Sequence, residues 1–317
     1  MERKKGKQQR KEKKLSFFNL IEQRILYFER LDKKKTASNY ICAFKHFKRF
    51  RGDQDIAIED LTVGQMKDFQ SYLIGEGLRM NTISLYNREL RAVYNYALDE
   101  EIIQMDKRPF RKSFTGQEKT RKRAVDGGVV KRLAILSLID KEMLGFARDL
   151  FLFSIYMQGM PFIDMAYLKK EQVRNGCITY QRRKTNRQLR VKIHPQAQII
   201  IDRYMVSDPG CPYLFLSCMI RKKTDGAIHS CALRVYNKRL DSLSSLLELD
   251  EPLTSYVARH TWASLARQCG TSDTVISEAM GHSHVGVTTI YLASLDIGMV
   301  AMANQRVITS LFRKRIP

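Results

Sequence analysis

The residues best suited to chemistry lie near the end of the 317-residue chain, between Leu253 and Tyr291. Arg259 is followed directly by a histidine, His282 stands in a Gly-His-Ser turn, and Tyr291 comes nine residues later. An arginine presents paired donors that match phosphate oxygens, and a tyrosine hydroxyl can act as a nucleophile. These residue types, brought together, could attack a phosphate without a metal.

The charge of the chain indicates a polyanionic partner. Lys and Arg number 55 against 33 Asp and Glu, which gives a net charge of +22. Basic residues gather at the N-terminus, over 107–123 and over 182–192. We expect double-stranded DNA, whose phosphates would supply much of the affinity, although a generally basic surface is the alternative. A membrane is disfavoured, because the basic runs adjoin no amphipathic apolar face.

The start of the chain and its cysteines suggest an intracellular protein. The first residues are charged and lead into no apolar signal region, so we expect a cytoplasmic protein. Six cysteines are scattered without C-x-x-C spacing, which predicts neither a zinc site nor disulfides. Free, buried thiols are the expectation.

The spacing of apolar residues predicts a helical first domain. Helices are expected over 15–32 and 36–51, then from a capping box at Thr62 and Gln65, and again after Asn81. The outer faces of these helices are basic. We therefore divide the chain into a disordered basic arm (1–14), a helical DNA-binding domain (15–105), a basic linker (106–123) and a second domain (124–317).

The second domain is predicted to be helical around a small sheet. Asp126 can cap a helix, and Met143–Met157 is apolar enough for a central one. The Asn-Gly pair at 175–176 is a strong hairpin signal, and further strands are expected over 177–182 and 189–193. The fold class is thus mainly α with a small three-stranded antiparallel sheet, α+β.

Four short motifs resemble one known family. The string A-R-H-T-W-A-S at 258–264, the G-H-S at 281–283, Tyr291, and Lys184 within R-R-K-T-N resemble the catalytic core of the tyrosine recombinases, which include phage-type integrases and invertases. The resemblance covers nearly the whole chain. It implies a SAM-like helical core-binding domain followed by a tyrosine-recombinase catalytic domain.

The resemblance also implies a role for each motif. Tyr291 would attack the DNA and form a 3′-phosphotyrosyl bond, Arg259 and His282 would hold the phosphate, and Lys184 would protonate the leaving oxygen. Such transesterification needs no metal, no ATP and no cofactor. His260 and the only tryptophan, Trp262, are expected to serve packing and hydrogen bonding rather than chemistry.

Two positions depart from the family pattern. Tyr256 stands where the family usually has a histidine; because its hydroxyl can still form a hydrogen bond, Tyr256 stays a site candidate. The first catalytic arginine of the family is replaced by Pro161, and the alternative position used by a branch of the family holds Gln158. Three explanations stay open: a substitute cation (Arg148, Arg187 or Arg190), a slow enzyme, or a DNA-binding relative with impaired chemistry.

We expect a site-specific DNA recombinase that integrates or excises a mobile element or inverts DNA. The alternative is a recombinase homologue that has lost catalysis and acts as an architectural or regulatory DNA-binding protein. The apolar stripe over 297–311 resembles the family helix that docks on a neighbouring protomer. The family resemblance implies a monomer in solution, a homotetramer on DNA, and an accessory DNA-bending protein as a further partner. It also implies a bacterial protein that joins the nucleoid when bound to DNA.

Overall fold

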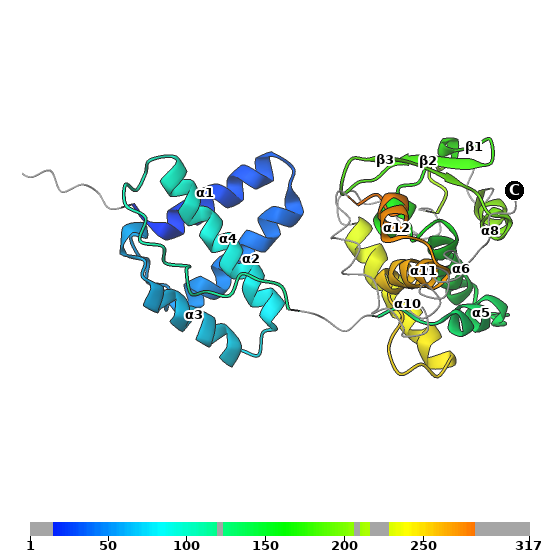
Figure 1. The fold of residues 1–317 in the computed structure, drawn as a ribbon, viewed down its shortest axis with the longest axis horizontal. Coiled ribbons are helices and arrows are strands. Elements are labelled where there is room, and N and C mark those ends of the chain that lie inside the picture. Colours follow the sequence, from blue (N-terminus) through cyan, green and yellow to red (C-terminus); the bar gives the residue numbers. More distant parts are fainter. Residues whose placement is uncertain (1–14, 119–122, 206–209, 216–227, 283–317) are drawn as a thin grey trace, which may run out of the picture. The chain divides into compact units, whose positions relative to one another are not determined.

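The computed structural model describes residues 15–118, 123–205, 210–215 and 228–282. The chain divides into two compact units, Met1–Thr120 and Arg121–Pro317, each of which has its own hydrophobic core. Both units are mainly helical, and the second contains one three-stranded antiparallel sheet (Figure 1). The predicted fold class is confirmed.

Within residues 15–118, the first unit is a bundle of four helices. They are α1 (Phe17–Arg30), α2 (Lys34–Phe50), α3 (Val63–Gly75) and α4 (Met80–Asp99), with a short 3-10 turn at Ile58–Asp60. Helix α2 packs against both α1 and α4. The predicted capping box opens α3: the Thr62 hydroxyl accepts from the Gln65 N–H at 3.2 Å, and the Gln65 side chain accepts from the Thr62 N–H at 2.9 Å.

The segment 106–118 lies against α4 of the first unit. Ser84 donates to the carbonyl of Gly116 at 2.5 Å, and the Asn87 amide donates to the carbonyl of Phe114 at 3.0 Å. Phe110 is buried in the core of this unit. Basic residues of the expected linker are thereby carried on the surface of the helical bundle, because side chains of α4 bind its backbone. The boundaries drawn from the sequence stay a prediction.

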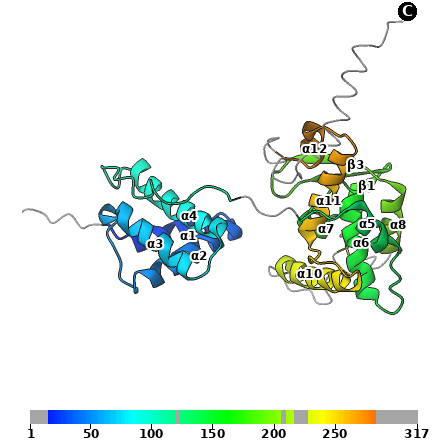
Figure 2. The same ribbon diagram turned by 60° about the horizontal axis from the view of Figure 1, so that its bottom comes forward.

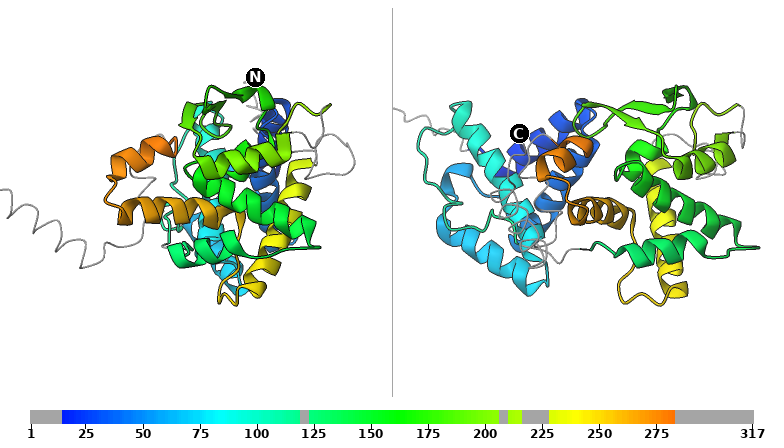
Figure 3. Two further views of the ribbon diagram at one scale, coloured as in Figure 1. Left: turned by 90° about the vertical axis from the view of Figure 1, so that its right-hand side faces the viewer. Right: turned by 45° about the vertical axis from the view of Figure 1, so that its right-hand side comes forward.

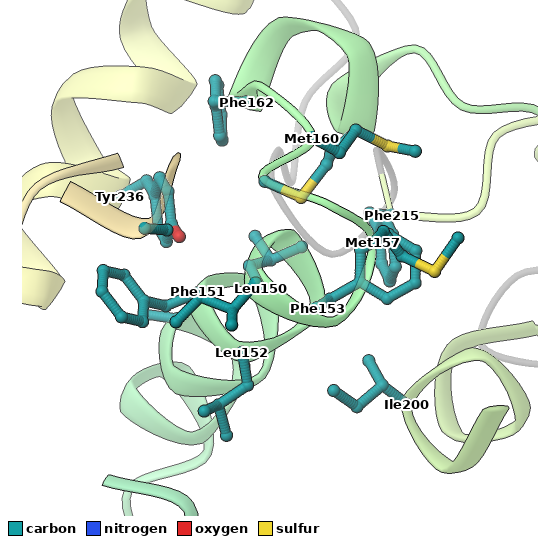
Figure 4. Packing of buried hydrophobic residues seen from close by; sticks show 14 of the residues in the cluster. Leu150, Phe151, Leu152, Phe153, Met157, Met160, Phe162, Ile200, Phe215 and Tyr236 are labelled. Carbon is teal, nitrogen blue, oxygen red and sulfur yellow. The ribbon is translucent and has the colours of Figure 1, made fainter. Parts of the chain in front are cut away.

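The second unit is built around α6 (Glu142–Tyr156). The other helices in the described part of this unit are α5 (Gly127–Ile135), α7 (Phe162–Ala166), α8 (Pro195–Met205), α10 (Ile228–Leu246), α11 (Ser255–Gln268) and α12 (Asp273–Ala279), with a 3-10 turn at Lys170–Gln172. Helix α6 contacts α5, α8, α10 and α11. It is apolar on nearly every side because neighbours surround it; Figure 4 shows Leu150, Phe151 and Phe153 pointing to different parts of the core. The predicted central helix is confirmed.

The sheet has the order β1 (Val173–Arg174), β2 (Cys177–Gln181) and β3 (Gln188–Lys192). Asn175 and Gly176 both have positive φ, +51° and +67°, as the predicted tight turn requires. Alternate residues face the core, so that Ile178 pairs with Val191, and Tyr180 pairs with Leu189. Helix α12 lies beside β3 (Figures 2 and 3).

The cysteines that the structure describes differ from the sequence-based expectation. The five described cysteines are free thiols, but none of them is buried, so the expectation of buried thiols is wrong. Cys42, for example, lies next to the exposed Ile41 on the outer face of α2, whose buried positions are Ala37, Tyr40, Ala43 and Phe47. Among the described helices, none is long and apolar enough to cross a membrane.

The segment at 106–118 should depend on Phe110. Phe110→Ala should lower the free energy of unfolding of the first unit by about 3–5 kcal/mol, since it removes a buried aromatic ring and leaves a cavity. Met105→Ala is the control: that side chain is 71% exposed, and its loss should change stability by less than about 0.5 kcal/mol. Urea unfolding, monitored by hydrogen exchange of peptides from 15–118, measures the free energy of unfolding of both variants. Equal stability of the two variants would contradict the packing described.

Candidate active site

Arg259 lies at the centre of the candidate site. It is on α11 and only 3% exposed. Its guanidinium donates from Nη1 to the carbonyl of Gly159 at 2.6 Å and from Nη2 to the carbonyl of Met280 at 2.7 Å. Gly159 has φ +70°, and a Cβ there would lie 3.2 Å from the Arg259 Cα. A glycine is therefore needed where the turn after α6 meets this arginine.

His282 is brought to Arg259 by the end of α12. The His282 N–H donates to the carbonyl of Ser277 at 3.0 Å, which closes the helix. Gly281, with φ +64°, makes the turn, and a Cβ on it would lie 2.9 Å from a methyl of Leu189. The result is a distance of 3.0 Å between Nε2 of His282 and Nη2 of Arg259. Two of the predicted site residues, 23 positions apart, are thus in direct contact.

The imidazole of His282 is held in its neutral form. Burial lowers its pKa to about 4, and the positive charges of Arg259, Arg182 and Lys184 add to the effect. Because a guanidinium only donates hydrogen bonds, Nε2 accepts from Arg259, and the single ring proton is assigned to Nδ1. At neutral pH this histidine can therefore donate one hydrogen bond while carrying no charge of its own.

The turn between β2 and β3 reaches the same place. Lys184 lies exposed in this turn, and its charge acts on His282. Thr185 donates to the carbonyl of Gly281 at 3.4 Å, and Arg187 donates to the carbonyl of His282 at 3.3 Å. The hairpin is thereby fastened to the residues that carry the histidine.

The two remaining predicted site residues are placed differently. Tyr256 is 51% exposed on α11, and its ring meets His260 edge-on, with centroids 4.8 Å apart. Tyr291 lies outside the described residues. The roles of both stay predictions. Trp262 packs against the hydrophobic core, as expected from the sequence.

Sequence reasoning missed Arg182 and Asp164. Arg182 is 5% exposed, and its Nη1 donates to the carbonyl of Gly281. Asp164 on α7 is 4% exposed and accepts from the backbone N–H of Arg183 at 3.0 Å. Burial raises the pKa of Asp164, an effect opposed by that hydrogen bond and by the charges of Arg182 and Arg259. The alternation of β2 could have revealed Arg182, because it continues the inward series of Ile178 and Tyr180.

The three arginines proposed from sequence as substitute cations are engaged or face elsewhere. Arg148 binds the carboxylate of Asp149 at 2.9 Å, an acid that also accepts a hydrogen bond from Tyr204 on α8. Arg187 pairs with Glu278 at 3.4 Å. Arg190 lies on the exposed face of β3.

Gln158 and Pro161 are uncharged, as the sequence shows; Gln158 lines a depression of about 330 Å³ between β3 and α12.

Comparison with known proteins identifies the family. The model of the phage integrase SAM-like domain matches residues 16–114, and that of the phage integrase family matches residues 132–296. The chain belongs to the phage integrase family, which is the family of the tyrosine recombinases, and the predicted resemblance is confirmed. A search of curated proteins gives no match.

Solved structures show the same fold at low sequence identity. A Tn1549 transposon integrase in complex with circular intermediate DNA has a TM-score of 0.70 and 14% identity, over 92% of this chain and 99% of that one. A lambda integrase dimer bound to a COC′ core site has a TM-score of 0.66 and 15% identity, over 89% and 100%. A lambda integrase tetramer bound to a Holliday junction has a TM-score of 0.68 and 16% identity, over 89% and 78%.

The state of His282 has a measurable consequence. Its imidazole should titrate near pH 4, because burial and three nearby cations disfavour the charged ring. An unfolded histidine takes up its proton near pH 6.5, so this residue should make the fold less stable as the pH falls from about 6.5 to 4. NMR of ¹⁵N-histidine-labelled protein, with His282→Asn to assign the signal, measures the midpoint. A midpoint near 6.5 would contradict the described environment.

Proposed function

We propose that the protein is a site-specific DNA recombinase that cleaves and rejoins strands through a covalent bond to Tyr291. The observation that carries the proposal is the buried contact between Arg259 and His282 in a chain of the phage integrase family. A net charge of +22 supports a DNA substrate. The similar integrases solved with DNA bound point the same way.

The proposed reaction is a transesterification. The Tyr291 hydroxyl gives its proton to solvent, its oxygen attacks the scissile phosphorus, and the bond to the 5′ oxygen breaks. That oxygen takes a proton from Lys184, which solvent then reprotonates. A free phenol has a pKa of about 10, so the attacking oxygen needs nearby cations to favour loss of its proton. Arg259 supplies a fixed positive charge next to the phosphate oxygens, and His282 adds a neutral donor. The phosphotyrosyl bond conserves the energy for rejoining, so no ATP is required. The fixed cations supply the positive charge that a metal would otherwise provide.

The biological outcome would be integration or excision of a mobile element, or inversion of a DNA segment. Both need two duplexes to be held together, and a homotetramer on DNA supplies four tyrosines for four strands. Lambda integrase, a similar fold, has been solved as a dimer and as a tetramer on DNA. Residues 297–311, which we expect to link protomers, lie outside the described residues. An accessory DNA-bending protein belongs to the same proposal.

A second candidate function is DNA binding without efficient cleavage. Gln158 and Pro161 favour it, because neither carries the charge that the family places there. Loss of one preorganised donor typically costs about 100- to 1000-fold in rate. The intact set of Arg259, His282 and Tyr291 favours the recombinase.

A covalent adduct distinguishes the two functions. The protein is incubated with a nicked half-site from the DNA that flanks its own gene, and adducts are separated on a denaturing gel. Wild type should form a protein–DNA adduct, whereas Tyr291→Phe should form none while binding the half-site equally well. Identical patterns from the two proteins would exclude the recombinase and leave the DNA-binding function.

A further inference from the structure

We propose that Arg182 supplies the second fixed guanidinium of the phosphate site and so replaces the charge absent at Gln158 and Pro161. The inference rests on the proposed recombinase function and names a residue that the family motif does not mark. It follows from where β2 ends and from what the Arg182 side chain touches.

The strand geometry turns Arg182 inward. In β2, Ile178 and Tyr180 face the core, and Arg182 continues the series one residue beyond the strand. The Arg182 N–H donates to the carbonyl of Arg187 at 2.8 Å, which fixes the backbone at the start of the turn. Its neighbours in the turn, Arg183 and Lys184, are exposed, so the basic cluster sends one arginine inward and the others toward solvent.

The side chain of Arg182 extends toward His282. Nη1 of Arg182 donates to the carbonyl of Gly281, the residue directly before His282. A Cβ on Gly281 would lie 3.1 Å from Cδ of Arg182, so the glycine leaves room for the arginine side chain to pass. Arg259 binds the carbonyl of Met280, so Arg182 and Arg259 bind the carbonyls of two consecutive residues directly before His282.

The positive charges of Arg182 and Arg259 act on the same two groups. The charges of both act on His282 and on the buried carboxyl of Asp164. Two guanidiniums next to one buried acid leave an excess of positive charge, which an anion can balance. The phosphate of a bound DNA strand has the charge that this arrangement lacks.

Arg182 also retains hydrogen-bonding capacity. Within the part of the chain that the structure describes, its buried Nε has no hydrogen-bond partner, and neither does Oδ2 of Asp164. A buried donor without a partner is costly, and such groups recur at functional sites. A phosphate oxygen beside His282 would satisfy Nε. Asp164, bound to the N–H of Arg183 at 3.0 Å, acts as a positioning residue for the start of the turn.

The other arginines near the site fit this role less well. Arg187 has a side chain that is 43% exposed, and its guanidinium already binds Glu278 and the carbonyl of His282. Arg148 neutralises the buried Asp149. Arg182 combines burial with direct contact to Gly281, the residue before His282.

The proposal is tested by removing the charge from the phosphate. Half-sites are prepared with the scissile phosphate or with a neutral methylphosphonate, and adduct formation is measured for wild type, Arg182→Ala, Arg182→Gln and Arg187→Ala. With the phosphate, both Arg182 variants should form adduct about 100- to 1000-fold more slowly than wild type. The methylphosphonate should restore at least ~10-fold of that loss, because no charge then needs to be neutralised.

The controls separate a catalytic role from a structural one. Arg187→Ala should gain nothing from the methylphosphonate, since its guanidinium binds protein groups. Arg182→Gln keeps a donor for Gly281 without the charge, and thermal unfolding with half-site binding shows that each variant is folded. The role of Arg182 is wrong if its variants form adduct at the wild-type rate. It is also wrong if folded variants lose activity that the methylphosphonate does not restore. Either result leaves the recombinase function standing. Absence of any adduct from wild type would overturn the recombinase proposal and this one with it.

Discussion

The buried guanidinium of Arg259 is the interaction on which the candidate site depends. It binds the carbonyls of Gly159 and Met280 and touches the imidazole of His282, so one side chain joins the turn after α6 to the end of α12. A charge in this position is costly to bury, and its fixed backbone acceptors repay part of that cost while setting its orientation. The donors are in place before any ligand arrives, which is the condition for electrostatic stabilisation of a transition state.

The small sheet matters because it brings further charge to this arginine. Its tight turn at Asn175 sets the register of the first two strands, and β2 then delivers Arg182 inward and Lys184 to the exposed turn. Burial lowers the pKa of His282, and the positive charges that converge on it add to the effect, so the ring stays neutral. One short hairpin therefore adjusts the protonation of a residue that is distant in sequence.

Much of this could be predicted from the sequence, and the exceptions have physical reasons. The capping box at Thr62 and the Asn-Gly turn at 175–176 are local signals, so they predicted elements correctly. The pairing of Arg259 with His282 followed from family motifs. Composition alone could not show which residue of a basic run is buried, so Arg182 was missed. The contacts of segment 106–118 were hidden for a similar reason: they depend on acceptors and donors of α4 rather than on the segment's own composition.

The central claim is that the phosphate binds where Arg259, His282 and Arg182 converge. A structure of Tyr291→Phe bound to a nicked half-site tests it most directly, because the variant holds the substrate without cleaving it. We predict scissile phosphate oxygens within about 3 Å of Arg259 and of Arg182, with Lys184 beside the 5′ oxygen. A scissile phosphate bound instead over the exposed face of β3, against Arg190, would contradict the account.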